Sequence, residues 1–279
     1  MAAAAPISWG DYLCRGIGGQ DAINMLDSKA QFHQGMFKKG VNADFYNVSG
    51  RAPDAVLSDF QNRFEDAEKR DIARAMGPIL QMLTDESGGS LLDKKIVDFG
   101  CGTGLFLRAL SERVGPRGLV LATEISEIFA AHLRHKVVTE GLDNARVLHN
   151  QDARNPELQA HRGTVDVIFV CDVYHHIEFP LSVMRNLRQA LRPSTGRLVV
   201  IDFIRDAAVH SSHPDQPDWI LQHVRADQTV FRAEILSAGF ELVAEPPSPY
   251  LPENYVMVFK PVPVEAWGKE VGVGWGMRK

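Results

Sequence analysis

The sequence predicts an α/β fold in which a mostly parallel, doubly wound sheet of seven strands carries helices on both faces. From about residue 94 onward, short apolar runs rich in Val, Ile and Leu alternate with segments of helical periodicity. Alternating glycines follow the first apolar run, and a short loop separates the last two runs. Strands that alternate with helices pair in parallel, because each helix returns the chain to the same end of the sheet.

Five apolar runs have the length and composition of strands that are buried on both faces. Two more runs follow the last predicted helix. Successive strands joined by a short loop form an antiparallel hairpin, so the sheet is expected to end in an antiparallel edge. In chain order, the seven runs are KKIVDFG, GLVLATE, ARVLHN, VDVIFVCD, GRLVVIDF, FELVAE and NYVMVFK.

The helices between these strands have recognisable ends. Ser126 can cap a helix that ends before Gly141, since serine accepts hydrogen bonds from the first turn and glycine is favoured just past the last. Pro180 can open the next helix, because its missing N–H is not needed there. A last helix is predicted in TVFRAEILSAG, just before the final pair of strands.

Composition and charge narrow the class of protein. The 279 residues carry a formal net charge of −5, which disfavours general nucleic-acid binding. The three cysteines are far apart and not in a metal-binding spacing, so we expect neither a structural disulfide nor a cysteine zinc site. The N-terminus does not have the pattern of a secretory signal, and no apolar run has the length of a membrane span. A cytoplasmic location is therefore expected, whereas the sequence does not indicate an oligomeric state.

We divide the chain into three parts. Residues 56–262 contain all the predicted strands and are expected to form the main domain. Residues 1–55 form an N-terminal extension or cap without a recognisable pattern, and residues 263–279 form a glycine-rich C-terminal tail. The roles of both end segments remain open.

The stretch VDFGCGTGLF, residues 97 to 106, is the strongest chemical signal. Glycines at the exit of a strand allow a tight turn and let a ligand lie against bare backbone at a helix N-terminus. A dinucleotide fingerprint has the spacing G-x-G-x-x-G, whereas Gly100, Gly102 and Gly104 alternate here. Asp98 adds a carboxylate that would repel a pyrophosphate. The loop therefore suits a ligand with a positive amino group and no phosphate.

Together with this loop, four later motifs resemble those of class I S-adenosylmethionine-dependent methyltransferases, which have a Rossmann-like fold. The resemblance covers roughly residues 60 to 260 and is closest to a small-molecule and uncharacterised branch with a Tyr-His-His run after strand four. Ser194 and Thr195 replace the two glycines that many relatives have in a surface turn. The motifs are DFGCGTG, VLATEIS, HNQDARN, CDVYHHIEFP and LRPSTGRLVVIDF.

The resemblance implies S-adenosylmethionine as the cofactor and assigns residues to its parts. Asp98 would pair with the amino group of the methionine moiety, and Glu124 would hold both ribose hydroxyls. Asp152 and the Ala153 amide would face the adenine edge. The cofactor site implied by the resemblance comprises Asp98, Gly100, Cys101, Gly102, Gly104, Glu124, Ile125, Asp152, Ala153 and Cys171.

The run DVYHHI contains the candidates for catalysis. His175 or His176 has an unperturbed pKa suited to proton transfer near neutrality, and Tyr174 could face the sulfonium. A histidine at a strand end is also often a structural imidazole bound to backbone. No metal is expected to bind this pair together with Glu178, because adjacent histidines at a strand end tend to diverge and no further ligand cluster is evident.

The long connection after the fifth strand should lie over the carboxyl ends of the strands. His223 and Arg225 in this connection are candidate acceptor contacts, and Asp202 is a third. Metal-dependent phenol methylation would need more clustered carboxylates than Asp172 and Asp202 provide.

The favoured function is methyl transfer to oxygen, nitrogen or sulfur of a small organic acceptor. A protein side chain is the alternative acceptor. Two other classes stay open: a nicotinamide oxidoreductase, against which the glycine spacing argues, and a non-catalytic S-adenosylmethionine-binding module that acts through a partner.

Overall fold

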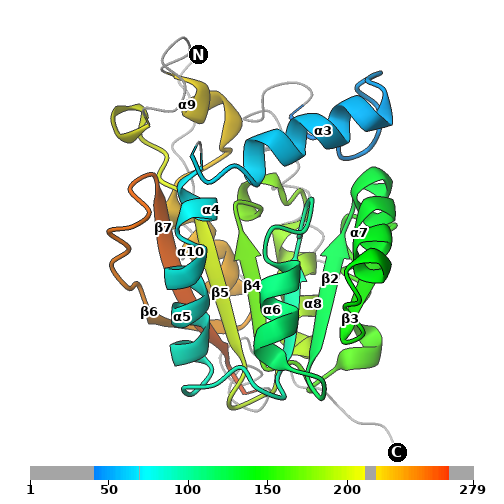
Figure 1. The fold of residues 1–279 in the computed structure, drawn as a ribbon. Helices are drawn as coiled ribbons and strands as arrows, with labels where there is room; N and C mark the ends of the chain where they lie inside the picture. Colours follow the sequence, from blue (N-terminus) through cyan, green and yellow to red (C-terminus); the bar gives the residue numbers. More distant parts are fainter. Residues whose placement is uncertain (1–40, 69, 211–217, 264–279) are drawn as a thin grey trace, which may run out of the picture.

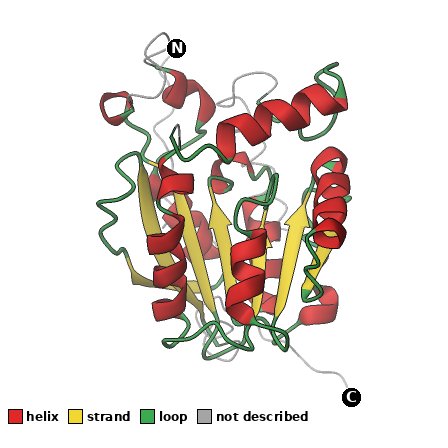
Figure 2. Cartoon of the chain, in the orientation of Figure 1, coloured by secondary structure: helices red, strands yellow, loops and turns green. Residues whose placement is uncertain are grey.

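The computed structural model describes residues 41–68, 70–210 and 218–263 and confirms the predicted fold class. One seven-stranded sheet has the order β3-β2-β1-β4-β5-β7-β6 and is surrounded by helices (Figures 1 and 2). The first strand, β1, lies in the middle of the sheet. The next two strands are added outward to β3, and β4 then lies on the other side of β1. This reversal leaves the carboxyl ends of β1 and β4 side by side, where ligands bind in doubly wound sheets.

The first five strands are parallel, and β7 lies antiparallel between β5 and β6. The antiparallel edge hairpin predicted from the last two apolar runs is therefore confirmed. The strands are β1 (Lys95–Phe99), β2 (Leu119–Glu124), β3 (Ala145–His149), β4 (Val167–Cys171), β5 (Arg197–Phe203), β6 (Phe240–Ala244) and β7 (Asn254–Pro261).

Helices cover both faces of the sheet, and each face has its own hydrophobic core. On one face, Leu83, Leu110 and Leu133 from α5, α6 and α7 pack on the sheet. On the other face, Leu187 and Phe231 from α8 and α10 do so. The helices are α3 (Pro53–Phe64), α4 (Asp71–Arg74), α5 (Met76–Glu86), α6 (Leu107–Val114), α7 (Glu127–Thr139), α8 (Pro180–Ala190), α9 (Trp219–His223) and α10 (Gln228–Ser237).

The predicted helix ends are found where the capping residues lie. The Ser126 side chain accepts a hydrogen bond from the Phe129 amide, and α7 ends two residues before Gly141, which has a φ of 64°. Pro180 is the first residue of α8. These local signals were sufficient because a cap acts on its own turn and needs no distant partner.

A layer of helices lies over the carboxyl ends of the strands. Figure 1 shows α3 and α9 there, with α4 below α3. Val56 and Phe60 of α3 form a small hydrophobic cluster with Phe129 of α7, which fixes α3 above this edge of the sheet. Three short 3-10 helices complete the described elements: η2 (Gln159–His161), η3 (Tyr174–His176) and η4 (Ala207–Val209).

The ends of the chain bear on the expected division into three parts. The boundary placed after residue 55 falls within α3, which begins at Pro53. Residues 1–40 of the N-terminal extension and 264–279 of the tail lie outside the described residues.

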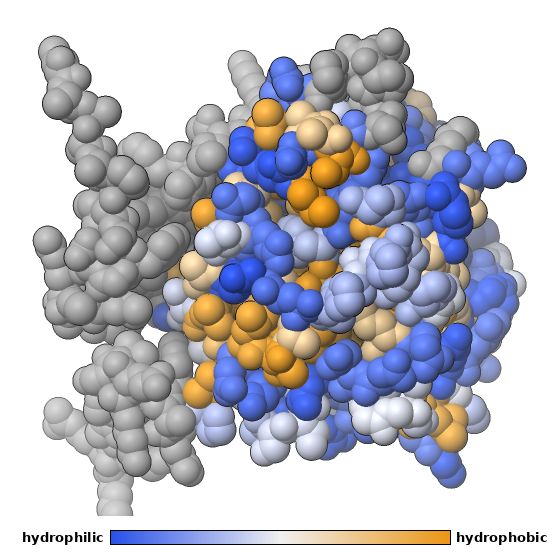
Figure 3. Space-filling model, turned by 90° about the vertical axis from the view of Figure 1, so that its left-hand side faces the viewer, coloured by the Kyte–Doolittle hydropathy of each residue, from blue (hydrophilic) through white to orange (hydrophobic). Residues whose placement is uncertain are grey.

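None of the described helices has the length and apolar character needed to cross a bilayer. Seen from the side of β6, the surface is mostly hydrophilic with small apolar groups between (Figure 3).

Candidate functional site

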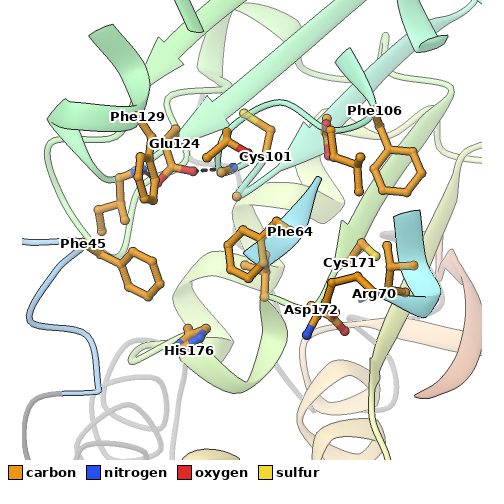
Figure 4. A pocket seen from close by; sticks show the side chains of 18 residues that line it. Phe45, Phe64, Arg70, Cys101, Phe106, Glu124, Phe129, Cys171, Asp172 and His176 are labelled. Carbon is orange, nitrogen blue, oxygen red and sulfur yellow. Dashed lines mark hydrogen bonds and ion pairs between the residues drawn. The ribbon is translucent and has the colours of Figure 1, made fainter. Parts of the chain in front are cut away.

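A pocket opens at the carboxyl ends of β1, β2 and β4, beneath the aromatic side chains of residues 45–64. It encloses about 850 Å³ between protein atoms, part of it open to solvent. Figure 4 shows its lining, and a second pocket adjoins it and shares Phe45, Gly100, Ile125, Val173 and His176.

The glycine loop forms one wall of the pocket with bare backbone. Gly100, Gly102 and Gly104 have φ values of 66°, 56° and 84°, a region that residues with a side chain rarely adopt. A Cβ on Gly100 would lie 2.6 Å from Val173, so glycine is also needed for packing there. A Cβ on Gly102 would meet only the Phe64 ring, at 4.0 Å. Gly102 therefore keeps space in the pocket open.

Asp98 lies at the floor of the pocket near the end of β1, where the sequence places the carboxylate. Its side chain is buried, and no hydrogen bond joins the carboxylate to another of the described residues. Burial, together with the nearby negative charge of Glu124, raises the pKa of Asp98 to about 7. A buried carboxyl group of this kind is suited to receive a positively charged ligand group.

Glu124 ends β2 and points back toward the glycine loop. One carboxylate oxygen accepts the Gly102 amide at 2.8 Å, and the other accepts the amides of Ile125 and Ser126 at 2.8 and 2.9 Å. Burial still raises the pKa of Glu124, although these N–H donors oppose the shift. Glu124 therefore ties the glycine loop to β2 and remains at the pocket wall with further acceptor capacity.

The second pocket lies over β3 and the start of α8. Ile125 and Val173 line it from two strand ends, and Ala153 and Asn150 line it from the β3 side. The Asp152 side chain is exposed, accepts the Arg154 amide at 2.9 Å in a local turn, and does not line either pocket. The structure thus brings Ala153 to the site and leaves Asp152 beside it.

Both cysteines assigned to the site line the main pocket. Burial raises the pKa of the Cys101 and Cys171 thiols well above their usual range. A protonated thiol is a weak nucleophile, so these residues shape the pocket wall rather than react.

Sequence reasoning missed the aromatic and basic residues that close the pocket. Phe45 and Phe64 come from the segment before the first strand, and both line the pocket with Phe129. Arg70 lies over the Phe64 ring at 5.5 Å and forms an ion pair with Asp172 at 2.5 Å. Phe64 and Arg70 belong to RFEDAEKRDIA, a stretch that also resembles the branch with the Tyr-His-His run, but the resemblance gives them no role. Their place in the site depends on how residues 41–68 and 70–74 fold back over the sheet.

Asp172 follows β4 in a strained backbone conformation. Its φ is 54°, which is uncommon for a residue with a side chain and typical of functional sites. Besides Arg70, the Asn254 side chain donates a hydrogen bond to it at 2.7 Å. Burial raises the pKa of Asp172 to about 6, against the opposing effect of Arg70.

His175 is fully buried beside the end of β5. Its Nδ1 lies 2.7 Å from an oxygen of Asp202, and the other Asp202 oxygen accepts the His175 amide at 3.1 Å. Its Nε2 lies 3.2 Å from the Nε2 of His223 in α9. The structure therefore brings together three residues that the sequence analysis assigned to separate roles.

His176 is the member of the pair that lines both pockets. Its Nδ1 lies 2.8 Å from the Asn42 side-chain oxygen, and its ring contacts Phe45 edge-on at 4.9 Å between centroids. Burial, aided by His175 and His223, lowers the pKa of His176 well below its usual range. The expected divergence of the two adjacent histidines is wrong, because their ring centroids lie 4.1 Å apart.

Two candidate residues lie in the core instead of the site. Tyr174 is fully buried, packs on Phe231 at 4.9 Å and does not line the pocket, because the 3-10 turn η3 directs it inward. Arg225 is also buried and forms two hydrogen bonds with Glu234, at 2.7 and 2.6 Å. The expectations that Tyr174 faces a reacting sulfur and that Arg225 contacts an acceptor are therefore corrected to structural roles.

Comparison with protein families agrees with this site. Residues 97–198, which run from β1 into β5, match the family model described as a methyltransferase domain. The demethylmenaquinone methyltransferase of Lactococcus lactis is 30% identical over 129 residues, 46% of each chain. The ubiquinone biosynthesis O-methyltransferase of Escherichia coli O157:H7 is 25% identical over 119 residues, 42% of this chain and 47% of that protein. The matches span about half the length of these relatives.

Solved structures show the same fold at low sequence identity. A S-adenosylmethionine-dependent methyltransferase from Aquifex aeolicus has a TM-score of 0.58 at 20% identity, covering 75% of this chain and 98% of that one. A putative sarcosine dimethylglycine methyltransferase from Galdieria sulphuraria has a TM-score of 0.52 at 16% identity, covering 85% and 98%. These two likenesses support the fold alone.

Proposed function

Since the chain carries a class I S-adenosylmethionine-dependent methyltransferase domain, we propose that it transfers the methyl group of S-adenosylmethionine to a small organic acceptor. The cofactor supplies a methyl group on a positively charged sulfur, which makes that methyl electrophilic. The protein then has to bind the cofactor, orient the acceptor and exclude water.

The observation that carries this proposal is the Asp98 carboxyl group beside the bare glycine backbone. A buried carboxyl that bonds to none of the described residues and has a pKa of about 7 fits the ammonium group of an amino acid moiety. The open space at Gly102 lets the ligand chain approach the backbone. A nicotinamide dinucleotide would bring its pyrophosphate to this loop, where Asp98 would repel it.

In this proposal, the main pocket holds the methionine and ribose parts of the cofactor, and the second pocket holds its adenine. Glu124 keeps acceptor capacity for the ribose hydroxyls, because a carboxylate has about four lone-pair sites and three are used by backbone N–H groups. Ile125 follows β2 and Val173 follows β4, and both line the second pocket, where they can hold the adenine ring between them. Ala153 and Asn150 would then lie along the adenine edge, with Asp152 outside it.

The lining of the main pocket favours an aromatic acceptor. Phe45, Phe64 and Phe129 form an apolar wall, with His176 against Phe45 and Arg70 over Phe64. Flat aromatic molecules pack well against such rings. The names of the curated relatives point to quinone biosynthesis, so we propose a phenol or hydroquinone as the acceptor class, with methyl transfer to oxygen.

His176 is the residue that we propose to orient the acceptor. It lines the pocket, and Asn42 fixes its ring through Nδ1. His175 and Asp202 would support it from below, because they are buried behind it.

The proposal is tested by calorimetry followed by a transfer assay. We expect the full chain to bind S-adenosylmethionine at micromolar concentrations and not to bind NADH. A panel of phenols, hydroquinones, amines and thiols is then incubated with the cofactor, and S-adenosylhomocysteine is measured. Tight NADH binding without S-adenosylmethionine binding would overturn the proposal, and cofactor binding without transfer to any acceptor would favour a binding module.

A further inference from the structure

We propose that His175, His176 and His223 bind a divalent transition-metal ion, best fitted by Zn²⁺, beside the acceptor pocket. One ring nitrogen from each residue lies within 4.8 Å of the other two. Three histidines with a fourth position left for substrate form a recurring catalytic zinc site. The ion site itself stands on this geometry; its role with the acceptor rests on the proposed function.

The distance between the imidazoles of His175, which is buried, and His223, which is half-buried, fits a shared ion. His175 Nε2 and His223 Nε2 lie 3.2 Å apart. Two ligands of a tetrahedral zinc ion lie about 3.3 Å apart, given Zn–N distances of about 2.0–2.1 Å. The third nitrogen, from His176, lies within 4.8 Å of the other two, so the His176 ring would have to move toward them to complete the set.

Hydrogen bonds orient His175 for this role. The Asp202 carboxylate lies 2.7 Å from His175 Nδ1, so this nitrogen carries the proton and Nε2 keeps its lone pair. Asp202 is fully buried and also accepts the Phe203 amide at 2.7 Å, which holds the carboxylate in place. A carboxylate that accepts from the outer nitrogen is the usual support of a metal-binding histidine.

The orientation of His176 follows from Asn42. The Asn42 side-chain nitrogen lies 3.2 Å from the His176 carbonyl and 3.0 Å from a Glu178 carboxylate oxygen, both of which only accept. The Asn42 oxygen must therefore be the atom that faces His176 Nδ1 at 2.8 Å. That nitrogen donates, and the Nε2 of His176 retains its lone pair.

The site opens where an acceptor would be needed. His175 is fully buried, but His176 lines the main pocket. An ion held here would bind the hydroxyl or thiol of the acceptor and lower its pKa, so that its proton leaves for solvent. The acceptor atom then bonds to the methyl carbon as the carbon–sulfur bond breaks, and the sulfur keeps the electron pair and becomes neutral.

The test measures metal binding directly. The full chain, purified without a polyhistidine tag and dialysed against a chelator, is titrated with Zn²⁺ by calorimetry and with Co²⁺ by visible absorption. We expect one ion per chain and the visible spectrum of tetrahedral cobalt. His223→Gln should weaken Zn²⁺ binding by about 100-fold or more, and Asp202→Asn by about 10- to 100-fold. His161→Gln, on a distant 3-10 helix, is the matched control and should bind like the parent.

The results of these measurements distinguish a failure of the metal site from a failure of the proposed methyl transfer. If the parent binds Zn²⁺ no more tightly than His223→Gln, the metal site is refuted, and the cluster is then a hydrogen-bonded histidine relay. S-adenosylmethionine binding by the same variants shows that they are folded. If the parent binds Zn²⁺ but not S-adenosylmethionine, the metal site stands and the proposed function fails.

Discussion

The two ends of the pocket are built differently. The glycine end, formed by Asp98, the loop after β1 and Glu124, comes from two neighbouring strand ends and is mostly backbone. The histidine end depends on side chains from four separate segments: Asn42, the pair His175 and His176, Asp202 and His223. The first can be predicted from a short motif, whereas the second appears only when the chain is folded.

The two ends also differ in how their charges are compensated. At the glycine end, Glu124 accepts three N–H groups, whereas the Asp98 carboxylate bonds to none of the described residues, and burial raises its pKa to about 7. At the histidine end, Asp202 accepts three N–H groups. A buried carboxylate without hydrogen bonds to the described residues indicates a ligand of opposite charge. A carboxylate that accepts several N–H groups, such as Asp202, indicates a rigid support for its neighbours.

The largest effect is expected at the glycine end, from Gly102→Val. The side chain would enter the pocket, and valine resists a φ of 56°. Calorimetry should show a loss of S-adenosylmethionine affinity of about 100-fold or more, roughly 3 kcal/mol. Gly141→Val is the matched control, since Gly141 has a φ of 64° and open space around it. Parental affinity in Gly102→Val would show that this loop does not hold the cofactor.

The next effect tests the histidine end. His176→Ala should lower the turnover of a hydroxyl acceptor by about 100-fold, because an acceptor that must lose a proton is no longer positioned and activated. Cofactor affinity should change by less than about tenfold, because none of the contacts proposed for the amino group, the ribose or the adenine involves His176, although it lines both pockets. His161→Ala serves as the control. A loss of cofactor binding in His176→Ala would remove the functional difference between the two ends.

Glu124 allows a finer test of the glycine end. Its three backbone hydrogen bonds mean that Glu124→Ala would leave buried N–H groups unsatisfied and destabilise the loop. Glu124→Gln keeps the shape of the side chain and is the better probe. We expect a loss of cofactor affinity of about tenfold, measured by calorimetry with a thermal melt as the control. An unchanged affinity would place the ribose elsewhere.

The same contrast explains which features of the fold and the site could be predicted from the sequence and which could not. The strands and the caps at Ser126 and Pro180 act within a few residues and were predicted correctly, and Asp98 lies near the end of β1, where the motif places it. The contact between Asn42 and His176 spans 134 residues and has no local signal. The inward direction of Tyr174 depends on a single 3-10 turn, and the burial of Arg225 depends on its pairing with Glu234. Side-chain direction and partners are set by packing, which a motif does not encode.

The smallest expected effect is a pH dependence that belongs to Asp98. Its carboxyl has a pKa of about 7 and must be ionised to pair with an ammonium group, so cofactor affinity should fall as the pH falls through this value. Between pH 7.5 and pH 6.5, protonation of Asp98 taken alone would lower the affinity by about threefold. The amino group of the cofactor also titrates near this range, which favours binding at lower pH.

The variant Asp98→Asn isolates the titration of the cofactor's amino group, because it lacks the carboxyl group. The ratio of parental to variant affinity, measured by calorimetry at both pH values, should therefore fall as the pH falls. If that ratio does not change, Asp98 does not pair with the charged group, and the ammonium must be held by another part of the pocket.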